Sequence, residues 1–84
     1  MITLKGQVSK IKVLKLDDSP LVRFTLDDVS CLIKIHSLNF MWEVDEGSEV
    51  VVCGEYNSRK QFVVRKYCVM NNEAFRTKYA TFGL

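Results

Sequence analysis

Three cysteines and one histidine are the residues of this 84-residue chain best suited to chemistry. Cys31, Cys53 and Cys68 lie far apart without a C-x-x-C pair, and His36 is the single histidine. A zinc site normally takes four ligands, often from closely spaced pairs, which this pattern does not provide. We therefore expect three reduced thiols in or near the core, and neither a metal site nor another cofactor.

Catalytic arrangements find little support in the sequence. His36 has no serine or cysteine partner that the sequence identifies. The pairs Asp17–Asp18 and Asp27–Asp28 fall in turns, where aspartate has a structural role, and a magnesium site built from them has no further support. A glycine-rich phosphate-binding loop is absent. We expect no catalytic residues, and no enzymatic activity from this chain alone.

Basic residues are the remaining group with chemical potential, because clustered cations bind phosphates. Lys and Arg number 12 against 10 Asp and Glu, a net charge of +2, so their placement matters more than their number. Placing them requires the strands and helices that carry them.

The composition indicates which class of protein this is. Hydrophobic residues make up 48% and charged residues 26%, as in soluble globular proteins, and the length suits one domain. No apolar run is long enough to cross a bilayer, and residues 1–5 lack the layout of a signal peptide. We therefore expect a cytoplasmic protein that does not contact a membrane.

Alternation of apolar and polar residues predicts five strands. The first begins at Ile2, and its apolar positions change parity after Val8, so a β-bulge is expected near Ser9 and Lys10. The third strand is expected to run from 29 to 36, and the fifth from 61 to 70. Turns are expected at 17–20, 27–28, 46–48 and 57–60. The inward positions of the last four strands are predicted to be Val22, Phe24, Leu26, Cys31, Ile33, Ile35, Val50, Val52, Gly54, Phe62 and Val64.

Two segments break the alternation. Ser37 is a plausible N-cap for a short helix that ends near Trp42. We expect this helix to close one end of a barrel formed by the five strands, with the Trp42 ring in the core. A second helix is predicted in the tail, where Phe75, Tyr79 and Phe82 recur on one helical face. That face either packs on its own barrel or binds a partner. The expected units are a barrel at 1–70 and a tail at 71–84.

The predicted order of elements is that of an OB fold, an all-β Greek-key barrel of five strands with a short helix between strands three and four. Residues 6–69 resemble bacterial single-stranded-DNA-binding proteins and the primosomal replication protein that shares their fold. The matching phrases are GQVS at 6–9, PLVRFTL at 20–26 and EGSEVVVCG at 46–54. The resemblance implies an OB barrel and a role in single-strand binding.

In this fold the outer face of the middle strands and the loops beside it bind oligonucleotides. Acidic residues gather elsewhere, at 43–49. Tyr56 is the best candidate for base stacking, although a place on the barrel rim is equally open, and the basic residues could be ordinary solvated strand residues. The predicted nucleic-acid-binding residues are Lys10, Lys12, Arg23, Lys34, His36, Tyr56, Arg59, Lys60 and Arg65.

These observations lead to one hypothesis and two alternatives. The hypothesis is a replication accessory protein that offers a surface for single-stranded DNA, with RNA also possible, to a polymerase, primase or helicase. The first alternative is an adaptor that binds such an enzyme through Phe75, Tyr79 and Phe82, because no aromatic residue shares a face with Arg23. The second is an RNA-binding protein of translation. Exposed strand edges would also permit a homodimer.

Overall fold

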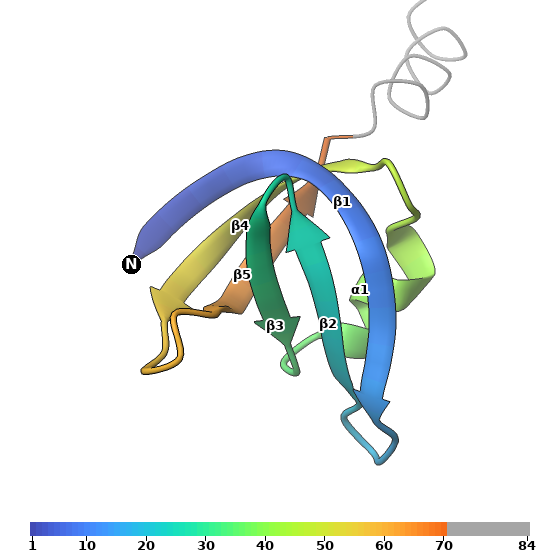
Figure 1. Cartoon of the computed structure of the whole chain (residues 1–84). Helices are drawn as coiled ribbons and strands as arrows, with labels where there is room; N and C mark the ends of the chain where they lie inside the picture. The colour runs from blue at the N-terminus through green and yellow to red at the C-terminus, as the bar shows by residue number, and fades with distance from the viewer. Residues whose placement is uncertain (71–84) are drawn as a thin grey trace, which may run out of the picture.

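Five strands close into a barrel with one short helix, in a computed structural model that describes residues 1–70. The strand order is β1-β2-β3-β5-β4, and β1 pairs with β4 to complete the circle (Figure 1). The elements are β1 Ile2–Lys15, β2 Leu21–Leu26, β3 Val29–Ile33, α1 Ser37–Glu43, β4 Glu49–Tyr56 and β5 Phe62–Val69. The predicted OB topology, with its helix between β3 and β4, is confirmed. The predicted tail helix lies outside the described residues.

Strand β1 closes the barrel because it pairs with two neighbours. Residues 2–7 pair with β4 and residues 8–15 pair with β2, both antiparallel. The register shifts between Ser9 and Lys12, and Lys10 there has a φ of 54°. The predicted bulge is confirmed, and the bend it introduces lets one strand arch over both halves of the sheet (Figure 1).

A second bulge, which the sequence analysis does not predict, lies in β5. Cys53 pairs with Lys66 and Gly54 with Val64, so Arg65 is left as the extra residue. The inward positions of β5 therefore change parity, and Tyr67 joins Val64 in packing against the core. On its other side β5 runs parallel to β3, but only over residues 62–64.

The core confirms the inward positions predicted for β2, β4 and β5. In β3 the prediction fails at one position: Ile35 is 48% exposed, because the strand ends at Ile33 and not at His36. Cys31 is buried and Cys53 is half-buried, as expected, whereas Cys68 is exposed. The buried apolar residues are Val8, Val22, Phe24, Leu26, Cys31, Ile33, Phe40, Val44, Val50, Val52, Phe62 and Val64.

Helix α1 closes one end of the barrel through Phe40. Its ring stacks on Phe24 at 4.5 Å and meets Tyr67 edge-on at 5.3 Å between centroids. The prediction that Trp42 lies in the core is wrong: the side chain is 90% exposed. The helix turns positions 37, 40 and 44 inward, which places position 42 on the far side. The N-cap is His36, with a φ of 64° and no side-chain bond, so the predicted serine cap is also wrong.

Candidate nucleic-acid interface

Two basic side chains lie side by side on the outer face of β1 and β2. Lys12 is the direct pairing partner of Arg23, which in turn pairs with Leu32 of β3. Arg23 lies between the buried residues Val22 and Phe24, so the pleat of β2 directs it outward. The Cβ atoms of directly paired residues in antiparallel strands are about 5 Å apart. The two side chains can therefore bind the same phosphate, or each can bind one of two successive phosphates. We call Lys12 and Arg23 the basic pair.

A row of hydroxyl groups lies beside the basic pair. Ser9 pairs with Thr25, and Thr25 pairs with Ser30, so three hydroxyl-bearing residues cross β1, β2 and β3 on the same face as Arg23. All three are half-buried. Hydroxyl groups donate hydrogen bonds to phosphate and sugar oxygens, so this row extends a cationic surface with neutral donors. The outward positions of β2 and β3 hold no aromatic ring.

The β4–β5 loop presents two further cations on a turn that is held by hydrogen bonds. The Asn57 side-chain oxygen accepts hydrogen bonds from the backbone N–H groups of Arg59 and Gln61, both at 2.9 Å. Lys60 takes a left-handed conformation with a φ of 63°. The loop is therefore held by its asparagine, and the side chains of Arg59 and Lys60 are exposed.

The segment that follows β3 brings Lys34 and His36 against the β1–β2 loop. Both residues line a hollow of about 190 Å³ together with Asp18 and Ser19 of that loop. The loop is shaped by the Asp17 carboxylate, which accepts a hydrogen bond from the Ser19 N–H at 2.9 Å. The sequence prediction placed both residues on β3, and the structure places them just beyond its end.

The remaining predicted residues are more dispersed. Lys10 lies in the β1 bulge, where its backbone N–H donates a hydrogen bond to the Glu46 carboxylate. The acidic segment 43–49, expected to lie away from the basic residues, therefore contacts Lys10. Arg65 is exposed at the β5 bulge. Tyr56 ends β4 with its ring edge-on to Phe62 at 5.2 Å, and it is 48% exposed. Tyr56 is thus a rim residue that keeps part of its ring open.

None of these cations is neutralised by a salt bridge within residues 1–70. The ion pair in this part of the chain joins Lys5 Nζ to Glu49 Oε1 at 3.5 Å. It lies where β1 pairs with β4, away from the basic pair. The predicted basic residues therefore keep their charge available for an anionic ligand.

Sequence reasoning missed two residues of the β1–β2 hairpin. A register shift between Val13 and Lys15 pairs Lys15 with Leu21, an outward position, so Lys15 adds a cation to the face of the basic pair. Leu16 follows at the tip of the hairpin and is 81% exposed. Broken alternation after Val13 was the available signal, because it indicates a second irregularity in the strand.

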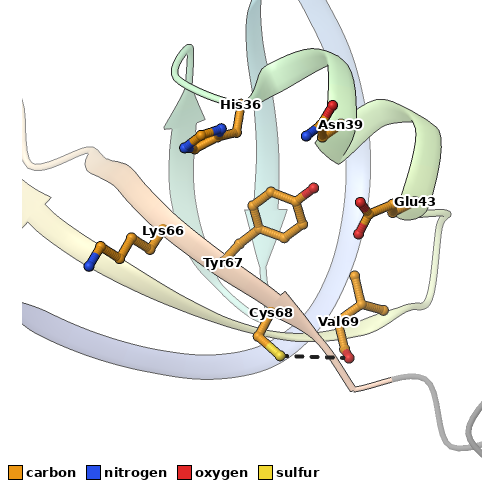
Figure 2. A pocket seen from close by; sticks show the side chains of 7 residues that line it. All are labelled: His36, Asn39, Glu43, Lys66, Tyr67, Cys68 and Val69. Atoms are coloured by element: carbon orange, nitrogen blue, oxygen red, sulfur yellow. Dashed lines mark hydrogen bonds between the residues drawn. The ribbon is translucent and has the colours of Figure 1, made fainter.

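A groove of about 630 Å³ separates α1 from β5 (Figure 2). Its lining includes Asn39 and Glu43 from the helix, and Tyr67 and Val69 from the strand. Burial, and then the negative charge of Glu43, raise the pKa of the Tyr67 phenol above its ordinary value. Lys66 and His36 line the other end of the groove.

No protein-family model, no curated protein and no solved structure matches the chain. Within the described residues, no cluster of three or more His, Cys, Asp or Glu side chains is placed to hold a metal ion. The same part of the chain contains no helix with the length and apolar character needed to span a bilayer. Function must therefore be argued from the barrel and its surface.

Proposed function

We propose that this chain is an OB module that binds single-stranded nucleic acid, DNA in the first place, across the outer face of β1, β2 and β3. The observation that carries the proposal is the direct pairing of Lys12 with Arg23 on that face. OB folds bind oligonucleotides on the strand 2–3 face, between the loops that join strands 1–2 and 4–5. Here both loops carry or adjoin exposed cations.

The binding mode follows from the chemistry of the face. Cations supply most of the affinity, since neutralising phosphates releases counterions, and the hydroxyl row adds hydrogen bonds to the backbone. Leu32 and Leu16 offer apolar contact to bases, and Tyr56 offers one partly open ring. With so little stacking, binding is of modest affinity, sensitive to salt and tolerant of sequence.

A role in DNA replication is supported by the resemblance of residues 6–69 to single-stranded-DNA-binding and primosomal proteins. A surface of modest affinity suits an accessory protein that presents the strand to a polymerase, primase or helicase. RNA binding in translation uses the same fold and the same kind of surface, so it becomes an outcome of the binding test.

A second candidate function is that of a protein adaptor. Leu38 and Trp42 lie four residues apart on α1 and are 58% and 90% exposed. Exposed apolar groups that share a helix face are typical of docking surfaces. In this case the barrel would bind the replication enzyme without binding DNA.

Fluorescence anisotropy with a labelled single-stranded oligonucleotide separates the candidates. Duplex DNA and RNA of the same sequence are the controls, at about 50 and about 200 mM salt. Preference for single-stranded DNA at micromolar affinity or better, weakened by salt, supports the proposal. Preference for RNA supports the translation alternative. Weak attraction to all three that salt abolishes would favour the adaptor.

A further inference from the structure

The groove between α1 and β5 is lined mainly by polar side chains around one aromatic ring. Tyr67 reaches from β5 toward the helix, where Asn39 and Glu43 form the opposite wall (Figure 2). His36 and Lys66 line the other end. The volume of about 630 Å³ lies within the range of sites for small organic ligands. A ligand of this groove must therefore form hydrogen bonds and also contact a ring.

The strand wall of the groove adds backbone groups that no other strand pairs within residues 1–70. β5 pairs with β3 only over residues 62–64 and with β4 as far as Val69. Met70 N–H donates to Glu49 O at 2.7 Å, which fixes the alternation of hydrogen-bonded pairs between β4 and β5. Tyr67 and Val69 accordingly direct their N–H and C=O groups away from β4, toward the groove. Two residues are too short an edge for a peptide strand, so these groups favour a compact ligand.

The helix wall sets an amide beside a carboxylate. Asn39 and Glu43 are four residues apart on α1, so their side chains are neighbours on one face of the helix. Both are exposed, and Glu43 forms no salt bridge within residues 1–70. The carboxylate accepts hydrogen bonds only, whereas the amide also donates them. Because the carboxylate repels phosphates and other anions, the group that binds here must present hydrogen-bond donors.

Guanine is the nucleobase whose Watson–Crick edge matches this wall. Its ring N–H and its exocyclic amino group are adjacent donors, which one carboxylate can accept together, and its carbonyl oxygen beside them accepts from an amide. Adenine and cytosine each place a ring-nitrogen acceptor beside the amino group, and that acceptor would face the carboxylate. Thymine has one donor between two acceptors. A flat base also stacks on an aromatic ring such as that of Tyr67.

We propose that the groove between α1 and β5 binds one guanine base. Glu43 accepts the ring N–H and the amino group, Asn39 donates to the carbonyl oxygen, and the Tyr67 ring stacks on the base. The guanine belongs to a free nucleotide or to a single strand that reaches the groove past His36, which also lines the hollow beside the β1–β2 loop. The inference goes beyond the proposed function, because a free guanine nucleotide can bind even if no strand does.

Titration of the isotope-labelled full chain with GMP, followed by NMR, tests the site. AMP and IMP are the comparison ligands, because all three share the sugar and the phosphate, and IMP lacks only the exocyclic amino group of GMP. GMP should shift the amide signals of Asn39, Glu43 and Tyr67. IMP should bind about tenfold more weakly, since it loses one hydrogen bond to a charged group. AMP should leave these signals in place at the same concentration.

Glu43→Gln separates base recognition from general electrostatics. Removing a negative charge would strengthen the binding of every nucleotide equally, whereas loss of the carboxylate acceptor should abolish the preference for GMP over AMP. Glu55→Gln removes the same charge from an exposed position on β4 that does not line the groove, and it should keep the preference. Circular dichroism confirms that both variants are folded.

Two thymidine oligomers, one with a single guanine and one without, distinguish the sources of the base. Tighter binding of the guanine oligomer, lost in Glu43→Gln, assigns the site to a strand, and equal binding of the two oligomers assigns it to a free nucleotide. Equal shifts with GMP and AMP, or a preference for GMP that survives in Glu43→Gln, would overturn the proposal. Either result leaves the outer face of β1, β2 and β3 to its own test.

Discussion

Glu46 holds the bulge of β1 by binding the backbone of Lys10. Its Oε2 accepts the Lys10 N–H at 2.9 Å, and its Oε1 accepts the Ile11 N–H at 3.0 Å. A bulge leaves backbone groups without a strand partner, and one carboxylate satisfies two of them. Gly47 N–H also binds Val8 O, so the turn before β4 fixes the bend by which β1 passes from one neighbour to the other.

Replacing Glu46 should therefore destabilise the barrel although the side chain lies on the surface. Glu46→Ala removes two charge-assisted hydrogen bonds, and because water can reach the freed N–H groups we expect a loss of about 1 kcal/mol. Urea unfolding measures it. Asp45→Ala in the same turn is the control, since the Asp45 carboxylate accepts no hydrogen bond from any group of residues 1–70. Equal stability of the two variants would show that the carboxylate does not hold the bulge.

Gly54 marks the closest approach of β4 to β5. A Cβ at this position would collide with the backbone carbonyl oxygen of Val63. Backbone cannot move aside as a flexible side chain can, so Gly54→Ala should cost about 3 kcal/mol, the upper end of typical overpacking penalties. Gly47, with a φ of 87° and open space around it, should lose only about 1 kcal/mol on the same change. Similar thermal midpoints for the two variants would contradict this ranking.

Phe40 and Trp42 should respond in opposite ways to truncation. Phe40→Ala removes a fully buried ring and should cost about 3–5 kcal/mol of unfolding free energy. Trp42→Ala should cost less than about 1 kcal/mol, because the side chain has little packing to lose within residues 1–70. Denaturant unfolding of both variants tests this. A larger loss at Trp42 than at Phe40 would mean that α1 is rotated from the orientation described here.

Alkaline pH should weaken the fold through Cys31. Burial raises the pKa of its thiol from 9.0 to about 11, against the weaker lowering effect of a backbone hydrogen bond. The folded state holds this proton more tightly than the unfolded chain, so the stabilisation is complete below pH 9 and is lost as the pH approaches 11. Between pH 8 and about 10.5, the wild type should lose about 2 kcal/mol more than Cys31→Val. Parallel losses in the two proteins would contradict the assignment.

The sequence predicted the barrel well because alternation reports directly on burial in a strand. Val22, Phe24 and Leu26 alternate without interruption, and the parity change after Val8 located the first bulge. The prediction failed in β3, where the alternation of the sequence continues beyond the end of the strand. Ile35 continued the alternation of β3, but the backbone had already turned toward α1, and local pattern carries no information about where tertiary contacts end a strand.

The helix and the site were less predictable for different reasons. In a helix of seven residues, one turn decides which face is buried, so Phe40 and Trp42 were equally eligible for the core. Lys12 and Arg23 could be identified from the sequence, because the alternation within each strand is enough to predict that both side chains point outward. Its neighbours in space, such as Lys15 and the hydroxyl row, depend on cross-strand register, which bulges shift and sequence does not reveal.

The central claim, that the basic pair contacts the phosphates of a single strand, is tested most directly by the salt dependence of binding. The variant Lys12→Gln with Arg23→Gln is compared with Lys5→Gln with Lys66→Gln, which removes the same charge from another side of the barrel. Each phosphate contact on a single strand contributes about 0.7 to the slope of log affinity against log salt. We expect the slope to fall by about 1.4 in the first variant and to stay unchanged in the second. Equal slopes in the two variants would contradict the proposed face.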